Sequence, residues 1–306
     1  MTKQSSSKFH RVLLGSAAVL TLAVSPAYAA TQGLEPVAVS AGVATATPSL
    51  MPVPASVSLP AGALPLSGGI TILWDQKPSA LLSRAADRFT HRIDALAGRV
   101  LPQQKDLAGP ATSIPVHIQV GEDRDALTVH AKENYSLHVN ASGVTLTAEG
   151  PDGVLHGLAT LAQLVTRGEN GPQLAFAEIT DSPRFPWRGI MIDTSRHFMA
   201  VSTLQRQLDA MELLKMNVLH LHLSDGTGFR VENKKFPELT EKGSHGQYYT
   251  QRELKDLVAY AADRGIRIVP EFDVPGHALA FLLAHPELAA QSPVNPEPKN
   301  KNNAAL

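Results

Sequence analysis

From residue 189 onward the chain alternates short apolar strands with amphipathic helices, and this alternation restricts the possible folds more than any other feature. Strands are predicted at residues 189–193, 218–223 and 266–269, separated by helices at 202–216 and 250–264 and followed by a short apolar helix at 278–284. Strands joined through helices run parallel, so the pattern predicts an α/β fold, either a (β/α)8 barrel or an open doubly wound sheet. No glycine-rich phosphate-binding motif follows any strand, which disfavours a nucleotide-binding sheet.

The two longer helices carry start and stop signals in their sequences. Ser202 with Gln205 and Thr250 with Glu253 have the spacing of capping boxes, in which a hydroxyl and a side chain three residues later satisfy the first free amides of a helix. Gly265 follows the second helix and is typical of a helix end.

Residues 61–181 show mixed periodicity and predict a small α+β domain with a few antiparallel strands and about two helices. The segment Asn140-Ala-Ser-Gly143 lies between two alternating stretches and indicates a hairpin. Four histidines are scattered through this domain without a catalytic pattern, and we interpret them as surface or structural residues: His117, His130, His138 and His156.

The two ends of the chain predict export and non-globular segments. Residues 1–29 combine a basic start, an apolar stretch too short to span a membrane and an Ala-Tyr-Ala cleavage signal, which predicts a signal peptide and a periplasmic or secreted product. Residues 30–60 read as an Ala/Pro-rich linker, with an edge strand near Val57 as the alternative, and residues 289–306 as a disordered tail. No later segment suggests a membrane span.

Composition excludes several classes of site. The net charge is −1, so a dedicated nucleic-acid binder is not expected, and the absence of cysteine excludes a disulfide framework and a thiol nucleophile.

Ionisable residues follow each of the three predicted parallel strands. The first strand leads to Asp193 and Arg196, the second to the segment 222–230, and the third to the segment 271–277. Ligands bind at the carboxyl ends of parallel strands, so this edge is the predicted site. Arg196 or Arg230 could instead pair with a structural aspartate. Glu271 and Asp273, two residues apart, could form an acid/base pair or a hydrogen-bonded network.

The pair His220 and His222 supports an alternative. Two residues apart on a strand, both imidazoles lie on one face, and such a pair can bind a metal ion. A metal-dependent barrel hydrolase built on these histidines with Asp273 and His277 is therefore a second hypothesis, although no further histidine pair or lysine completes the ligand set. We expect neither a metal nor another cofactor under the main interpretation.

Three linked motifs carry a family resemblance. They are RGIMIDTSRHF at 188–198, HLHLSDGTGFR at 220–230 and PEFDVPGH at 270–277. In this order and spacing they resemble the first strand ends of the barrel of family 20 glycoside hydrolases, the β-N-acetylhexosaminidases. The preceding α+β domain resembles, by architecture and position, the small domain that precedes this barrel. The resemblance implies a truncated (β/α)8 TIM barrel, with residues 182–288 as its first part.

The resemblance also implies a chemistry and residue roles. In the family the substrate's own 2-acetamido oxygen attacks the anomeric carbon, with net retention, an exception to the two-carboxylate scheme. The substrate would be an oligosaccharide or glycoconjugate ending in N-acetylglucosamine or N-acetylgalactosamine. By resemblance, Arg188 would bind sugar hydroxyls, Asp225 and His277 would form a polar network that tunes the acid, Asp273 would hold the loop of His277, and Glu271 would be structural.

One family element is missing from the sequence. The family acid belongs to an adjacent Asp-Glu pair after the fourth strand, and these 306 residues contain no Asp-Glu dipeptide. Three of eight β/α units are recognisable. The sequence therefore predicts an N-terminal portion of a hexosaminidase that is inactive alone. A non-catalytic sugar-binding protein is the remaining alternative.

Overall fold

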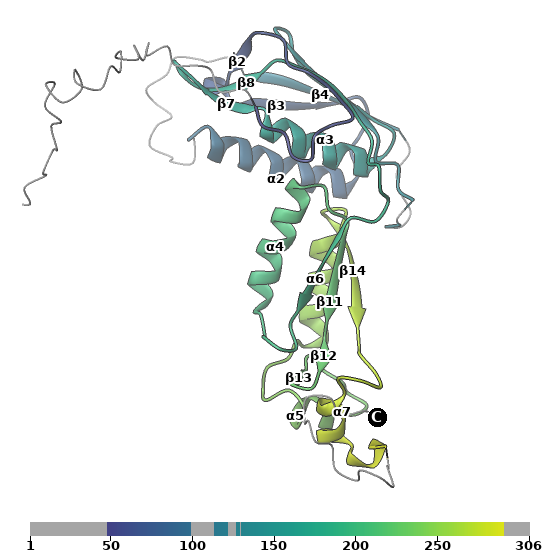
Figure 1. Ribbon diagram of the computed structural model, residues 1–306. Coiled ribbons are helices and arrows are strands. Elements are labelled where there is room, and N and C mark those ends of the chain that lie inside the picture. The colour runs from purple at the N-terminus through teal and green to yellow at the C-terminus, as the bar shows by residue number, and fades with distance from the viewer. Residues whose placement is uncertain (1–47, 99–112, 122–126, 129, 291–306) are drawn as a thin grey trace, which may run out of the picture. The chain divides into compact units, whose positions relative to one another are not determined.

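The computed structural model describes residues 48–98, 113–121, 127–128 and 130–290 (Figure 1). The signal peptide, the first part of the linker and nearly all of the predicted tail lie outside the described residues. We use "small domain" for the described residues up to 181 and "parallel-sheet region" for residues 182–290. No helix among the described residues has the length and apolar character that crossing a bilayer requires.

The small domain contains two sheets and two helices. The larger sheet has six strands in the order β1-β9-β5-β6-β4-β3, and the smaller has three in the order β2-β8-β7. Their bounds are β1 Ser56–Ser58, β2 Ala63–Pro65, β3 Ile70–Trp74, β4 Ile114–Val120, β5 Tyr135–Asn140, β6 Gly143–Ala148, β7 Val165–Gly168, β8 Gly171–Ala175 and β9 Ala177–Asp181. The helices are α2 Ala80–Leu96 and α3 Pro151–Gln163, and a 3-10 turn, η1, spans Leu66–Gly68.

The expectation of antiparallel strands in this domain is wrong for part of the larger sheet. Strand β4 pairs in parallel with both β3 and β6, whereas β5 pairs antiparallel with β6 and β9. For β3 and β4 the reason is the connection, because α2 lies between them and a helical crossover returns the chain in the same direction. The hairpin at Asn140–Gly143 is confirmed, with these two residues paired at its end. Strand β1 pairs with β9, so the alternative of an edge strand near Val57 is confirmed.

The parallel-sheet region has the alternation that the sequence predicts. Its sheet has the order β10-β11-β14, and both pairings are parallel. The strands are β10 Gly189–Asp193, β11 Val218–His222 and β14 Arg267–Glu271, joined through α4 Val201–Leu213 and α6 Gln251–Ala262 (Figure 1). Between them lie a short hairpin of β12 Ser224–Asp225 and β13 Gly228–Phe229, and the short helix α5 Glu238–Glu241; α7 Leu279–Ala284 and the 3-10 turn η3 Pro286–Leu288 follow β14.

The helix caps agree with one of the two sequence predictions. At α6 Thr250 and Glu253 form both hydrogen bonds of a capping box, and Gly265 takes a positive φ of 73° beyond the helix end. At α4 the predicted cap is wrong, because the N-cap is Ala200 and no side chain caps the helix. The hydroxyl of Tyr249 donates to the carbonyl of Met199 at 2.7 Å, which fixes the backbone just before Ala200 and leaves Ser202 inside the first turn.

Buried ion pairs join the small domain to the parallel-sheet region. On one side Arg88 of α2 donates to Glu212 of α4 at 2.7 Å. On another side Lys215 donates to Asp181 at 2.7 Å, and Arg188 contacts Glu133 at 2.5 Å. The charges are therefore paired where the two parts meet, as burial requires.

Candidate active site

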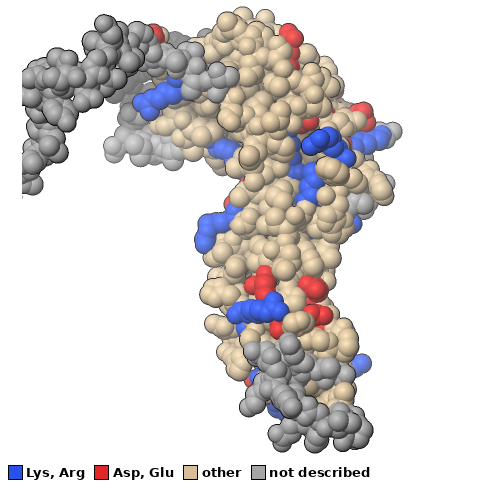
Figure 2. All heavy atoms as spheres, in the orientation of Figure 1, with Lys and Arg blue, Asp and Glu red and all other residues tan. Residues whose placement is uncertain are grey.

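Polar side chains converge at the carboxyl ends of β10, β11 and β14. The Arg196 guanidinium contacts a carboxylate oxygen of Asp225 at 2.5 Å and one of Asp193 at 2.7 Å. The imidazole nitrogen Nδ1 of His277 lies 3.4 Å from Asp225 and 3.4 Å from Arg196. Acidic and basic atoms gather over this end of the sheet in Figure 2. The ends of the three strands thus bring together four charged or titratable side chains from three segments that are far apart in sequence.

Asp225 is the centre of this cluster. It is only 3% exposed, while the Arg196 side chain is 52% exposed. Besides Arg196 and His277, Asp225 accepts a hydrogen bond from the backbone N–H of Gly226 and lies 3.2 Å from Nε2 of His222. A buried carboxylate with this many donors is fixed in place, and it holds the exposed guanidinium beside it.

His222 links Asp225 to a second carboxylate. Its Nδ1 lies 2.9 Å from Glu271, and Nε2 of His220 lies 2.9 Å from the same oxygen of Glu271. Burial opposes a charge on His222, but its contacts with Glu271 and Asp225 outweigh burial and raise the pKa of the imidazole above its usual value. The hydrogen bond from His222 in turn lowers the pKa of Glu271.

This arrangement predicts a pH dependence of stability. A raised folded-state pKa means that His222 stabilises the fold fully below its ordinary pKa of 6.5, and that this contribution is lost as pH rises through the folded-state pKa. The free energy of unfolding, measured by urea titration at pH values on both sides of 6.5, should decrease over that window in the unmodified chain and change less in His222→Gln. His130→Gln, at an exposed position, is the control. An unchanged slope in His222→Gln would contradict the assignment.

The two histidines of the metal-site alternative, His220 and His222, contact a carboxylate in this structure. Nε2 of His220 and Nδ1 of His222 both lie 2.9 Å from Glu271, so this carboxylate is the partner of one nitrogen of each imidazole, and Nε2 of His222 faces Asp225. Within the described residues no group of three or more histidine or carboxylate side chains has the arrangement to hold a metal ion. Asp273 donates its backbone N–H to the Ser224 hydroxyl at 3.1 Å, which ties the end of β14 to β12.

The structure does not bring Arg188 into this cluster. Arg188 precedes β10, and five strand residues at ~3.3 Å each put about 16 Å between the two ends of that strand. Its guanidinium is occupied by Glu133 at 2.5 Å, by the Phe185 carbonyl at 2.6 Å and by the Lys215 carbonyl at 2.8 Å. The expectation that Arg188 binds hydroxyls of the terminal N-acetylhexosamine does not agree with this geometry, in which protein groups accept the hydrogen bonds of its guanidinium.

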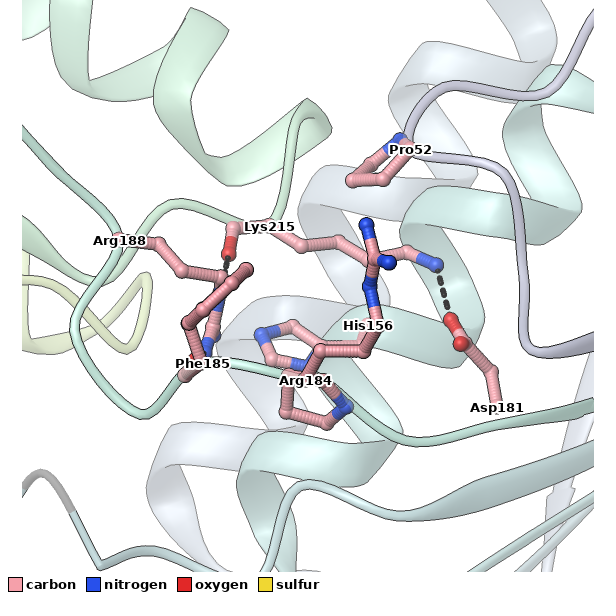
Figure 3. A pocket seen from close by; sticks show the side chains of 8 residues that line it. Pro52, His156, Asp181, Arg184, Phe185, Arg188 and Lys215 are labelled. Carbon is pink, nitrogen blue, oxygen red and sulfur yellow. Dashed lines mark hydrogen bonds and ion pairs between the residues drawn. The ribbon is translucent and has the colours of Figure 1, made fainter.

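Figure 3 shows the surroundings of Arg188, a small cavity lined by residues of both parts of the protein. His156 is buried there, and burial together with the nearby Arg188 and Lys215 charges lowers its pKa to about 3. The imidazole is therefore neutral at ordinary pH, which agrees with the interpretation of His156 as a structural residue.

The residue that sequence reasoning undervalued is Arg196. The sequence places it at the predicted site edge, with a structural aspartate as its alternative partner, and the structure pairs it with both Asp193 and the buried Asp225. Its position after the carboxyl end of the strand, rather than before the amino end, was the signal that could have identified it. Arg230, by contrast, has no aspartate or glutamate partner in the described part of the chain and donates to backbone carbonyls.

Comparisons with known proteins agree with the motifs. The model of the glycosyl hydrolase family 20 catalytic domain matches residues 185–305, and the model of domain 2 of the same family matches residues 47–182. The match to the catalytic-domain model extends to residue 305 and thus includes most of the predicted tail, residues 289–306.

Curated relatives and solved structures are similar to this chain over part of their length. The β-hexosaminidase subunit A1 of Dictyostelium discoideum is 32% identical, over 80% of this chain and 46% of its own length. The β-hexosaminidase of Akkermansia muciniphila is 40% identical over 56% of this chain and 37% of its own length.

Among solved structures, the Flavobacterium johnsoniae chitobiase matches with a TM-score of 0.71 and 39% identity, over 79% of this chain and 37% of that one. The Vibrio harveyi exo-β-N-acetylglucosaminidase, solved with N-acetylglucosamine, matches with a TM-score of 0.66 and 27% identity, over 86% and 43%. The chain thus spans less than half the length of these relatives. Because two models of one family together match residues 47–182 and 185–305, the chain belongs to glycosyl hydrolase family 20.

Proposed function

We propose that this chain supplies the small domain and the first part of the sugar site of a β-N-acetylhexosaminidase, which releases terminal N-acetylglucosamine or N-acetylgalactosamine with retention. The observation that carries the proposal is the contact of Arg196 with the buried Asp225 beside His277, at the carboxyl ends of three parallel strands. The family membership and the complex of the Vibrio harveyi relative with N-acetylglucosamine support it.

The residue roles follow from exposure and charge. Arg196 is half-exposed and keeps its planar guanidinium at the surface of the site, so it contacts paired sugar hydroxyls. Asp225 pairs with Arg196, and Nδ1 of His277 lies 3.4 Å from the same carboxylate. Asp225 and His277 therefore form the polar network that flanks the acid. Asp273 keeps the loop between β14 and His277 against β12 through its backbone. None of these groups supplies the family's Asp-Glu pair, which is absent from the 306 residues.

The parallel-sheet region forms the first three β/α units of a (β/α)8 barrel in this proposal. The support is the parallel order β10-β11-β14, the helices between the strands and the similarity to the chitobiase of Flavobacterium johnsoniae. We further propose that residues 1–29 direct export, on the basic and apolar composition of that segment.

The proposal predicts activity for a chimera and none for the chain alone. Residues 185–288 would replace the matching segment of the Akkermansia muciniphila β-hexosaminidase, and turnover of an aryl N-acetyl-β-glucosaminide would be measured. The chimera should hydrolyse the substrate, and Arg196→Ala should lower kcat/KM by roughly a hundredfold, as expected when a charged hydrogen bond to the reacting sugar is lost. The 306-residue chain should show no turnover.

The matched control is Arg206→Ala, which removes an arginine of α4 that donates an exposed hydrogen bond to the Thr203 hydroxyl at 3.0 Å. It should leave the chimera's kcat/KM unchanged. A folded chimera that is inactive, or one in which Arg196→Ala is as active as its parent, would refute the proposed site. Robust turnover by the 306-residue chain would refute the inference that it lacks the acid.

A further inference from the structure

Arg230 is a buried arginine bonded to carbonyls. It is 4% exposed and follows β13. Its guanidinium donates five hydrogen bonds, all to backbone carbonyls: to Thr194 at 3.1 Å, Ser195 at 2.7 Å, Thr227 at 3.4 Å, Ser244 at 2.7 Å and Gln247 at 2.8 Å. Burial lowers the pKa of Arg230 from its usual value, while the nearby Asp193 charge acts in the opposite direction. Five donors in one plane can join several backbone segments at once.

The five carbonyls belong to three separate segments. Thr194 and Ser195 lie in the loop from β10 to α4, Thr227 lies in the turn between β12 and β13, and the other two lie in the loop that precedes α6. Two further bonds join the first two segments: the Ser195 hydroxyl donates to the Gly228 carbonyl at 2.6 Å, and the Thr227 hydroxyl donates to the Ser195 carbonyl at 3.1 Å. Arg230 is therefore the common donor for three loops.

Two of these loops carry the candidate sugar site. Ser195 immediately precedes Arg196, and Thr227 follows Asp225 by two residues. The contact of Arg196 with Asp225 at 2.5 Å thus joins the same two loops that the Arg230 guanidinium holds together from below the surface. The relative position of Arg196 and Asp225 depends on how these loops are held.

The chain leaves space for this guanidinium. A Cβ atom placed on Gly228 would lie 2.2 Å from Cζ of Arg230, so a side chain there is incompatible with the observed position of the guanidinium. The guanidinium also lies over the Phe198 ring, whose centroid is 5.8 Å from Cζ of Arg230 and 4.9 Å from the centroid of the Tyr249 ring. The position of the guanidinium is thus set by packing as well as by hydrogen bonds.

We propose that Arg230 is a positioning residue of the sugar site, which sets Arg196 against Asp225 by joining the two loops that carry them. The role of Arg230 in the sugar site rests on the proposed function, whereas its joining of the two loops does not. Arg230 itself contacts no sugar, because it is buried beneath these loops. Its removal therefore acts on substrate only through Arg196 and Asp225.

The test uses the 306-residue chain and its Arg230→Ala variant, which leaves a cavity of guanidinium shape. Amide hydrogen exchange should increase roughly tenfold or more at residues 194–198, 226–228 and 244–247, and remain unchanged in strands β5 and β6 of the small domain. Guanidinium ion, added far below denaturing concentration, should restore the protection, and ammonium at the same concentration should not. Unchanged loop exchange, a uniform increase over the whole chain or a failure of guanidinium to restore protection would each overturn the proposal.

Two further variants separate positioning from general destabilisation. Arg264→Ala removes another buried arginine, which bonds to Asp209 and the Tyr260 carbonyl, and should not raise exchange in the three loops. Gly228→Ala leaves Arg230 in place but displaces its guanidinium, and should loosen the same loops as Arg230→Ala. Loosening by Arg264→Ala to the same extent, or no effect of Gly228→Ala, would count against the proposal.

Calorimetry with N-acetylglucosamine gives the second measurement. If the chain binds the sugar, Arg230→Ala should weaken the affinity at least tenfold, and guanidinium should recover it. No binding by the unmodified chain would refute sugar binding by this chain, while the exchange experiment would still decide the role of Arg230. Sugar affinity that is equal in the chain and in Arg230→Ala would refute the positioning role.

Discussion

Asp225→Ala is expected to lower the free energy of unfolding by about 3 kcal/mol and to abolish hydrolysis in the chimera. Asp225 is 3% exposed, and its carboxylate accepts a hydrogen bond from the Gly226 backbone N–H and contacts the His222 and Arg196 side chains. Without it the amide and the buried imidazole lose their acceptor, and Arg196 loses the partner that fixes its direction. Arg196 is half-exposed and regains water, so most of the stability loss comes from the two buried donors. Urea unfolding of the 306-residue chain measures the first effect, and chimera kinetics the second.

Asp225→Asn provides the comparison. The amide keeps the shape and can still accept from Gly226, but its NH2 group replaces the oxygen that faces Arg196 and His222. It should recover part of the stability and little of the activity. The control Asp256→Ala removes an exposed aspartate of α6 that pairs with the exposed Arg252, and should change stability little. Full activity of Asp225→Asn would show that the charge of Asp225 is not needed.

Glu133→Ala is expected to cost about 3–5 kcal/mol of stability, the range for breaking a buried ion pair. Glu133 is 7% exposed and meets Arg188 through two hydrogen bonds, at 2.5 and 3.0 Å. Alanine would leave the Arg188 guanidinium, with 16% of its side chain exposed, without its carboxylate. The loss should appear in urea unfolding of the 306-residue chain. The control Arg84→Ala breaks an ion pair in which the arginine is 53% exposed, and should cost far less.

The double variant Glu133→Leu with Arg188→Met tests the electrostatic origin of that loss. Replacing both charges by apolar groups of similar volume removes the desolvation cost together with the pair, so the double variant should be more stable than Glu133→Ala. Its affinity for N-acetylglucosamine should equal that of the unmodified chain, because Arg188 lies at the opposite end of β10 from Asp225. If the double variant is folded but binds the sugar more weakly than the unmodified chain, the result would support sugar binding by Arg188.

The sequence predicted the parallel-sheet region well because its signals are local. Apolar strand residues, amphipathic helices and the Thr250–Glu253 capping box act over a few residues, and the structure has them at or close to the predicted positions. The errors arose where a local pattern had a competitor from elsewhere in the chain. At α4 the Ser202 cap was displaced by a backbone position that Tyr249 fixes from 50 residues away. In the small domain, strand direction followed from the crossover through α2.

In the candidate site, too, some features follow from local sequence and others from contacts with distant residues. The motifs around Asp225 and His277 predict a site at the edge of the sheet where the structure brings these side chains together, because the carboxyl ends of parallel strands meet on one side. The sequence by itself determined the α/β alternation, the family resemblance and the absence of an Asp-Glu pair. Only the tertiary structure decided which arginine joins the site, because the choice depends on distant partners. Glu133 pairs with Arg188 at one end of β10, Asp225 pairs with Arg196 at the other, and Arg230 donates to both loops that carry Arg196 and Asp225. A charged side chain takes its role from the opposite charge that folding places beside it, and that neighbour is not adjacent in sequence.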